Sequence, residues 1–190
     1  MQSRSSDANI NTFIRKSVPG VIFLAQPKDT LRYDAVDCAS PQRVGSVSAG
    51  WSKTSSPQAV GEETMPHILC VDDEQDILSV ATLALEMVGG FTVSSVTNGS
   101  DAVWAAEDTQ PDLILLDVMM PQMGGPATLK ALRENRNTAG IPVVFMTARV
   151  QAHEVAEYLE LGASAVIHKP FDPMLLPSQL KEVLQWTRTN

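Results

Sequence analysis

The sequence of 190 residues has little that would suit a secreted or membrane protein. Two cysteines, Cys38 and Cys70, are too few for a disulfide framework or a cysteine metal site, which favours a reducing compartment. The longest apolar runs are about five residues, whereas a membrane helix needs ~20. The run at 21–25 follows Pro19 and Gly20 and is too short and interrupted for a signal peptide. We therefore expect a cytoplasmic protein without a membrane span.

Basic residues are also scarce, with 14 Lys and Arg against 22 Asp and Glu and a net charge of −8. Nucleic-acid binding needs a basic surface, so we predict no nucleic-acid partner. The sequence has no Gly-x-x-x-x-Gly-Lys-Ser/Thr loop and no Gly-x-Gly-x-x-Gly turn, which argues against a nucleotide site. The hydrophobic content of 44% is nevertheless enough for the core of one globular domain.

The composition changes near residue 64. Residues 1–64 are rich in serine and nearly neutral, whereas residues 65–190 carry the excess of acidic side chains. We predict that 1–64 form a disordered extension, because they cannot bury enough apolar surface to offset the entropy of ordering, and that 65–188 form the folded domain. A second hypothesis is that translation starts at Met65, which an N-terminal peptide from upstream of Met65 in mass spectrometry would contradict.

From Met65 onward, short apolar runs alternate with amphipathic segments. The runs at 67–71, 91–96, 113–116, 142–146 and 165–167 have the character of strands, and the segments that follow them have helical spacing. The run 113–116 is apolar on both faces, as a central parallel strand should be. Five strand–helix units predict a parallel five-stranded sheet with helices on both faces, which is a three-layer α/β/α domain.

Polar side chains stand where the predicted strands end. They are Asp72, Asp73, Asp117, Thr147 and Lys169. Ligands bind at this edge of an open parallel sheet. If the first and third strands are neighbours, the three aspartates converge, and two carboxylates ~4 Å apart repel by ~4 kcal/mol at an effective dielectric of ~20. A divalent cation with oxygen ligands, such as Mg²⁺, would neutralise them.

The other two residues suit a phosphate group. Lys169 would bring a positive charge to a phosphate oxygen, and Thr147 would add a hydroxyl donor. Taken singly, each residue is commonly a helix cap, a turn residue or a surface charge. Their coincidence at the strand ends favours a site for moving a phosphoryl group.

Four segments together resemble a response-regulator receiver domain of two-component signalling. They are Ile68-Leu-Cys-Val-Asp-Asp-Glu74, Leu115-Leu-Asp-Val-Met-Met-Pro121, Met146-Thr-Ala148 and Lys169-Pro-Phe171. The resemblance covers Met65 to Arg188. It implies a flavodoxin-like sheet with strand order 2-1-3-4-5.

The resemblance also implies roles for individual residues. Asp117 would accept a phosphoryl group from a phosphohistidine on a sensor histidine kinase or a histidine phosphotransfer protein. Thr147 and Lys169 would bind the phosphoryl oxygens, and the Lys169–Pro170 bond would be cis. The implied Mg²⁺ ligands are Asp72 (through water), Asp73, Asp117 and the backbone carbonyl of Met119. The domain would assist its own phosphorylation and dephosphorylation, and would not be an enzyme acting on a separate substrate.

The sequence departs from the family pattern at a few positions. Val166 stands where the family usually has a switch aromatic, and Gly124 replaces a usual acid. Met119 and Arg149 occupy positions that tend to tune the lifetime of the aspartyl phosphate in the family.

Only two residues follow Arg188, so we expect a single-domain regulator that is read by a downstream protein. The expected contact surface is the fourth helix, fifth strand and fifth helix, with Tyr158, Val166 and Trp186. For Trp186, packing on the domain itself is an equal alternative.

Two other functions remain open at this point. A non-phosphorylated binding module on the same fold is favoured by Val166 alone. A metal-dependent phosphatase would need a second acid two residues after its nucleophile, where this chain has Met119.

Overall fold

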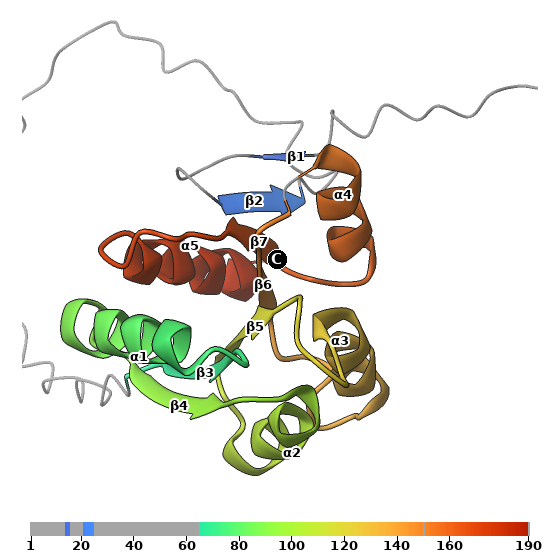
Figure 1. The fold of residues 1–190 in the computed structure, drawn as a ribbon, viewed down its shortest axis with the longest axis horizontal. Coiled ribbons are helices and arrows are strands. Elements are labelled where there is room, and N and C mark those ends of the chain that lie inside the picture. Colours follow the sequence, from blue (N-terminus) through green and yellow to red (C-terminus); the bar gives the residue numbers. More distant parts are fainter. Residues whose placement is uncertain (1–13, 16–20, 25–64, 150, 190) are drawn as a thin grey trace, which may run out of the picture. The chain divides into compact units, whose positions relative to one another are not determined.

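The computed structural model describes residues 14–15, 21–24, 65–149 and 151–189, all within one compact unit (Figure 1). The strands form one sheet in the order β1-β2-β7-β6-β5-β3-β4. The strands are β1 Ile14–Arg15, β2 Val21–Leu24, β3 His67–Val71, β4 Thr92–Val96, β5 Leu113–Asp117, β6 Val143–Thr147 and β7 Ala165–His168.

Five of these strands are parallel and lie in the order β4-β3-β5-β6-β7. Numbered along the domain, this order is 2-1-3-4-5, so the prediction of a flavodoxin-like parallel sheet is confirmed. Strands β3 and β5 are neighbours, and Cys70 lies opposite Leu115. Strand β6 then joins β5 to β7, with Phe145 opposite Val166. This arrangement brings the ends of β3, β5, β6 and β7 to one edge.

The helices follow the strands in sequence, as expected. They are α1 Gln75–Ala84, α2 Gly99–Thr109, α3 Gly125–Glu134, α4 Ala152–Glu160 and α5 Leu176–Thr189. Asn98 caps α2 by accepting a hydrogen bond from the Asp101 amide at 2.8 Å. A π-helical turn, η3 Leu85–Gly89, extends α1, and Gly90 follows it with a φ of 70° that favours glycine. Among the described residues, no helix has both the length and the apolar composition to cross a membrane.

The core lies on both faces of the sheet, because successive strand residues point to opposite sides. In β3, Ile68 and Cys70 join the apolar cluster that contains residues of α1 and α5. Leu69 and Val71 join the opposite cluster, which contains residues of α2, α3 and α4. The predicted three-layer architecture is therefore confirmed.

The sheet extends beyond the five predicted strands. Strand β2 pairs antiparallel with β7, and β1 pairs antiparallel with β2. Residues 14–15 and 21–24, within the segment predicted to be mostly disordered, thus form strands, which the sequence analysis did not predict. The physical reason is that a four-residue apolar run shows no folding tendency of its own, while a distant strand can supply its hydrogen-bond partners. The rest of residues 1–64 lies outside the described residues, and the Met65 start remains a hypothesis.

Gly125 begins α3 at a close approach to β5. A Cβ atom there would lie 2.5 Å from the carbonyl oxygen of Asp117 and 2.9 Å from the Cα of Val118. We therefore expect Gly125→Ala to lower the free energy of unfolding by about 1–3 kcal/mol, measured by urea denaturation. Gly140→Ala is the control, because nothing lies within 4 Å of its Cβ position. Equal urea midpoints for the two variants would contradict the prediction.

Candidate functional site

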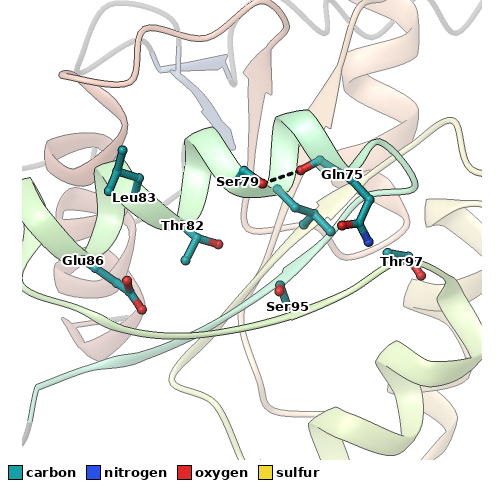
Figure 2. Close-up of a pocket in the computed structure, with 8 residues that line it drawn as sticks. Gln75, Ser79, Thr82, Leu83, Glu86, Ser95 and Thr97 are labelled. Carbon is teal, nitrogen blue, oxygen red and sulfur yellow. Dashed lines mark hydrogen bonds between the residues drawn. The ribbon is translucent and has the colours of Figure 1, made fainter.

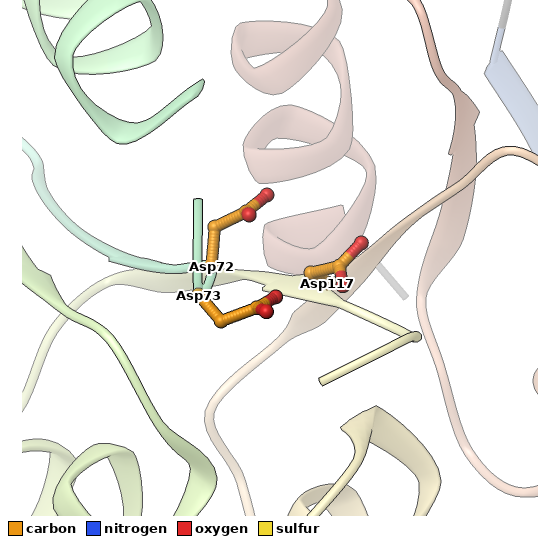
Figure 3. A group of neighbouring side chains, drawn as sticks. All are labelled: Asp72, Asp73 and Asp117. Carbon is orange, nitrogen blue, oxygen red and sulfur yellow. The ribbon is translucent and has the colours of Figure 1, made fainter. Parts of the chain in front are cut away.

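Three carboxylates meet where β3 and β5 end. Asp72 and Asp73 directly follow β3, and Asp117 is the last residue of β5 (Figure 3). One oxygen from each lies within 4.8 Å of the others. Asp72 and Asp117 are buried, while Asp73 is exposed. The convergence expected from the sequence is thus present, because β3 and β5 are hydrogen-bonded neighbours.

Lys169 lies between the two buried carboxylates. Its Nζ is 2.6 Å from Asp72 Oδ2 and 2.7 Å from Asp117 Oδ1, and its side chain is only 14% exposed. The remaining oxygens accept backbone hydrogen bonds. The Glu74 amide donates to Asp72 Oδ1 at 3.0 Å, and the Met119 amide donates to Asp117 Oδ2 at 2.9 Å. Both buried carboxylates are thereby held in fixed orientations.

Burial and nearby charges shift the pKa values of Asp117 and Lys169. Burial raises the pKa of Asp117, and the nearby Asp72 also raises it, although the hydrogen bond and charge of Lys169 oppose the rise. Burial lowers the pKa of Lys169, but hydrogen bonds and charges from Asp117 and Asp72 more than offset this and leave it raised. Lys169 therefore stays protonated. One ammonium against three carboxylates leaves an excess of negative charge that favours a cation.

Thr147 ends β6 at the same edge and is buried. Its Oγ1 accepts a hydrogen bond from the Arg149 amide at 3.0 Å. Its carbonyl accepts one from the Lys169 amide at 2.8 Å, which ties the end of β6 to the end of β7. The Lys169–Pro170 bond is cis, as the resemblance implies.

Sequence reasoning missed a contact between β6 and α4, which joins Phe145 to Tyr158. Burial and the charge of Glu154 raise the pKa of the Tyr158 phenol, and a hydrogen bond with the Thr147 side chain lowers it in part. The Tyr158 ring also packs edge-on against Phe145, with centroids 5.3 Å apart. No local signal announces this contact, because it joins a helix to the strand before it.

Two expected surface residues are not free for a partner. Val166 is buried at 1% exposure and lies opposite Ile22 of β2, so β2 covers this part of the predicted contact surface. Trp186, on α5, packs against the core cluster that contains other residues of this helix. This agrees with the alternative that Trp186 packs on the domain itself. The cause is the same in both cases, because neighbouring elements cover positions that the sequence pattern leaves open.

The other positions that departed from the family pattern differ in exposure. The Met119 side chain is exposed, and the exposed Arg149 forms an ion pair at 3.7 Å with Glu154, whose side chain is only 16% exposed. Gly124 precedes α3 and makes no side-chain cap. The metal role of the Met119 carbonyl stays a prediction.

Chemistry elsewhere in the described part of the chain is limited. Burial, followed by the charges of Asp72 and Glu86, raises the pKa of Cys70 to about 12, so this thiol stays protonated. A pocket of about 370 Å³ lies between α1 and β4 (Figure 2). Its lining includes Glu86 and Ser95 but none of the five predicted site residues. We therefore place the candidate site at the aspartate cluster.

The domain thus has a flavodoxin-like parallel sheet, and a buried aspartate–lysine cluster lies at the ends of its strands. The family model of the response regulator receiver domain matches residues 68–181, and the chain belongs to this family. Receiver domains are not enzymes in the usual sense. They take part in phosphorylation-dependent signalling with histidine kinases and typically bind Mg²⁺ in an acidic pocket.

Individual relatives agree with this assignment. The response regulator SaeR of Staphylococcus aureus (strain USA300) is 34% identical over 120 residues, which cover 63% of this chain and 51% of that protein. The chain thus spans about half the length of the curated relatives it matches.

Solved structures match over nearly their whole length. The chemotaxis protein CheY4 of Vibrio cholerae is 29% identical with a TM-score of 0.60, covering 63% of this chain and 99% of that chain. A response regulator from Desulfuromonas acetoxidans is 32% identical with a TM-score of 0.58, covering 63% of this chain and 97% of that chain.

Proposed function

We propose that the chain is a response regulator whose receiver domain accepts a phosphoryl group on Asp117. The donor is a phosphohistidine of a sensor histidine kinase or a histidine phosphotransfer protein, and a downstream protein reads the phosphorylated state. The observation that carries the proposal is the cluster of Asp72, Asp73 and Asp117 with their oxygens within 4.8 Å and only Lys169 between two of them.

The donor set fits Mg²⁺. Two oxygens on one Mg²⁺ are about 3–4 Å apart, close to the spacing of the three carboxylates, and carboxylate oxygens suit this hard cation. Asp73, Asp117 and the carbonyl of Met119 would hold it directly, and Asp72 would do so through water. When bound, Mg²⁺ neutralises charge on the phosphoryl oxygens and the carboxylates.

The chain's own residues account for the rest of the chemistry. An oxygen of Asp117 attacks the phosphorus, the bond from phosphorus to the donor histidine nitrogen breaks, and an aspartyl phosphate forms. Lys169, already 2.7 Å from Asp117 Oδ1, pairs with a phosphoryl oxygen, and the Thr147 hydroxyl donates to another. The same groups stay around the phosphate during hydrolysis, so the domain assists its own dephosphorylation.

A surface beside the site suits docking of the donor. Helix α1 begins at Gln75, directly after the acidic residues. Val80, Leu83 and Met87 are exposed at helical spacing along α1 and its π-helical turn. An exposed apolar stripe is typical of a surface that packs against a partner helix, which supports a helical phosphohistidine donor.

Phosphoryl incorporation tests the proposal directly. The chain is incubated with a small phosphodonor, with Mg²⁺ or with a chelator, and its intact mass is recorded. We expect one added phosphoryl group that requires Mg²⁺. A folded chain that gains none, with rapid sampling to exclude a short lifetime, would favour the non-phosphorylated binding module instead.

The role of Asp73 can be tested through metal affinity. We expect Asp73→Asn to weaken Mg²⁺ binding at least about tenfold, because ligand charge sets the affinity of such sites. The measurement is the Mg²⁺ dependence of the melting temperature. Without metal the variant should be as stable as the unchanged chain, since Asp73 is exposed and Lys169 contacts the other two aspartates. Asp108→Asn, an exposed acid on α2, is the control; equal Mg²⁺ affinities would contradict the prediction.

A further inference from the structure

The two edges of the five-stranded parallel sheet differ in character. Strand β4 lies at one edge, is partly exposed and carries the polar residues Ser94 and Ser95, which is typical of an edge strand that faces solvent. Strand β7 would be the other edge, and Ala165, Val166 and Ile167 are all buried. An uncovered apolar edge offers unpaired backbone N–H and C=O groups to any passing strand. This edge therefore needs a cover.

Strand β2 provides the cover. Val21 lies opposite Ile167, and Ile22 lies opposite Val166, in antiparallel register. Val21 is 1% exposed and belongs to the core cluster on the α1 and α5 side. Ile22 packs against the opposite cluster, and β2 also lies against α4. The run Val-Ile-Phe-Leu is apolar at every position, which suits a strand covered on both faces.

We propose that the β7 edge, flanked by α4 and α5, is a strand-binding site and that residues 21–24 are its intramolecular occupant. While they are in place, a partner protein that presents an extended apolar segment cannot pair with β7. Main-chain hydrogen bonds give such a site its affinity, and the two alternating side-chain positions filled by Val21 and Ile22 give it selectivity. This proposal is independent of phosphoryl transfer.

The covalent connection makes the occupant a strong competitor. A tethered segment acts at an effective concentration of up to about millimolar and keeps most edges covered. The apparent affinity of a free strand is then multiplied by the small fraction of chains whose edge is open. The covered edge also shares a strand with the candidate site. Ile167, which faces Val21, precedes His168 and Lys169 in the sequence.

Hydrogen exchange on the full chain tests the pairing. We expect the amides of 21–24 and 165–168 to exchange slowly in the unchanged chain. Val21→Asp should raise exchange in both segments at least about tenfold, because it places a charge in the core cluster. Val80→Asp makes the same change at an exposed position and should leave both segments unaffected.

A synthetic peptide with the sequence of residues 19–26 tests the site itself. We expect it to bind the Val21→Asp chain at least about tenfold more tightly than the unchanged chain and to restore slow exchange at 165–168. Equal binding to both chains, or a concentration-dependent dimer of the unchanged chain that exchanges strands, would overturn the proposal. Circular dichroism checks that Val21→Asp is folded. If it is not, Ile22→Asp at the partly buried position replaces it.

Rapid exchange of 21–24 and 165–168 in the unchanged chain would also overturn the proposal, and this measurement needs no variant. Phosphorylation is measured separately by mass. Failure of strand pairing and failure of phosphoryl transfer are therefore distinguishable.

Discussion

Asp117→Asn is expected to lower phosphoryl incorporation from a small phosphodonor at least about a hundredfold, to below detection by intact mass. The amide that replaces the carboxylate has no negative oxygen to attack phosphorus, so the acyl phosphate cannot form. Because Asp117 is buried and has its own place beside Lys169 and the Met119 amide, no neighbouring carboxylate can take over its position.

The matched control for Asp117→Asn is Asp108→Asn, which removes an equal charge from an exposed position on α2. It should incorporate the phosphoryl group as the unchanged chain does. Peptide mapping of the unchanged chain should place the group on Asp117. Incorporation that persists in Asp117→Asn, or maps to Asp72 or Asp73, would contradict the assigned acceptor.

Lys169→Met is expected to lower the free energy of unfolding by about 3–5 kcal/mol in the absence of Mg²⁺. The reason is that Asp72 and Asp117 lose their shared ammonium and remain buried. Urea denaturation at neutral pH measures the loss. Adding Mg²⁺ should restore part of it, because a cation at the cluster replaces the missing positive charge.

The pH dependence of Lys169→Met follows from the pKa of Asp117, which burial already raises. Without Lys169 this pKa rises further above its value in the unfolded chain. The cost of the buried charge is then fully present above the folded-state pKa and disappears as the pH falls toward the unfolded-state pKa. The deficit against the unchanged chain should therefore be largest at neutral pH and shrink in acid.

Lys130→Met is the control for Lys169→Met. Lys130 is exposed and lies 4.0 Å from Glu134 one helical turn away, so the loss of this pair should change stability by no more than about 0.5 kcal/mol. A similar loss of stability in both variants, or a Lys169→Met deficit that ignores pH and Mg²⁺, would show that the buried cluster does not depend on the Lys169 charge.

Local patterns account for most of the fold predicted from the sequence. The run Leu113–Leu116 is apolar at every position and stands between amphipathic segments, which favours a strand covered on both sides, and the structure buries all four residues. Strand order was not visible in these patterns and came from the family resemblance.

The candidate site could be predicted from the sequence to a similar extent as the fold. Asp72, Asp117 and Lys169 stand at strand ends, and parallel pairing brings strand ends together, so their convergence follows once the order of the strands is known. The sequence did not reveal that Lys169 contacts both buried aspartates, or that Tyr158 packs against Phe145. Both contacts depend on side-chain positions across separate elements.

The sequence by itself determined the alternation of strands and helices, the two apolar faces of the central strands and the placing of charged residues at strand ends, because these follow from spacing along the chain. The tertiary structure alone decided that Val21 and Ile22 complete the sheet and that Val166 is covered. A short apolar run has no fixed structure until a distant strand supplies its hydrogen-bond partners. Its role is therefore set by long-range pairing, which local sequence does not encode.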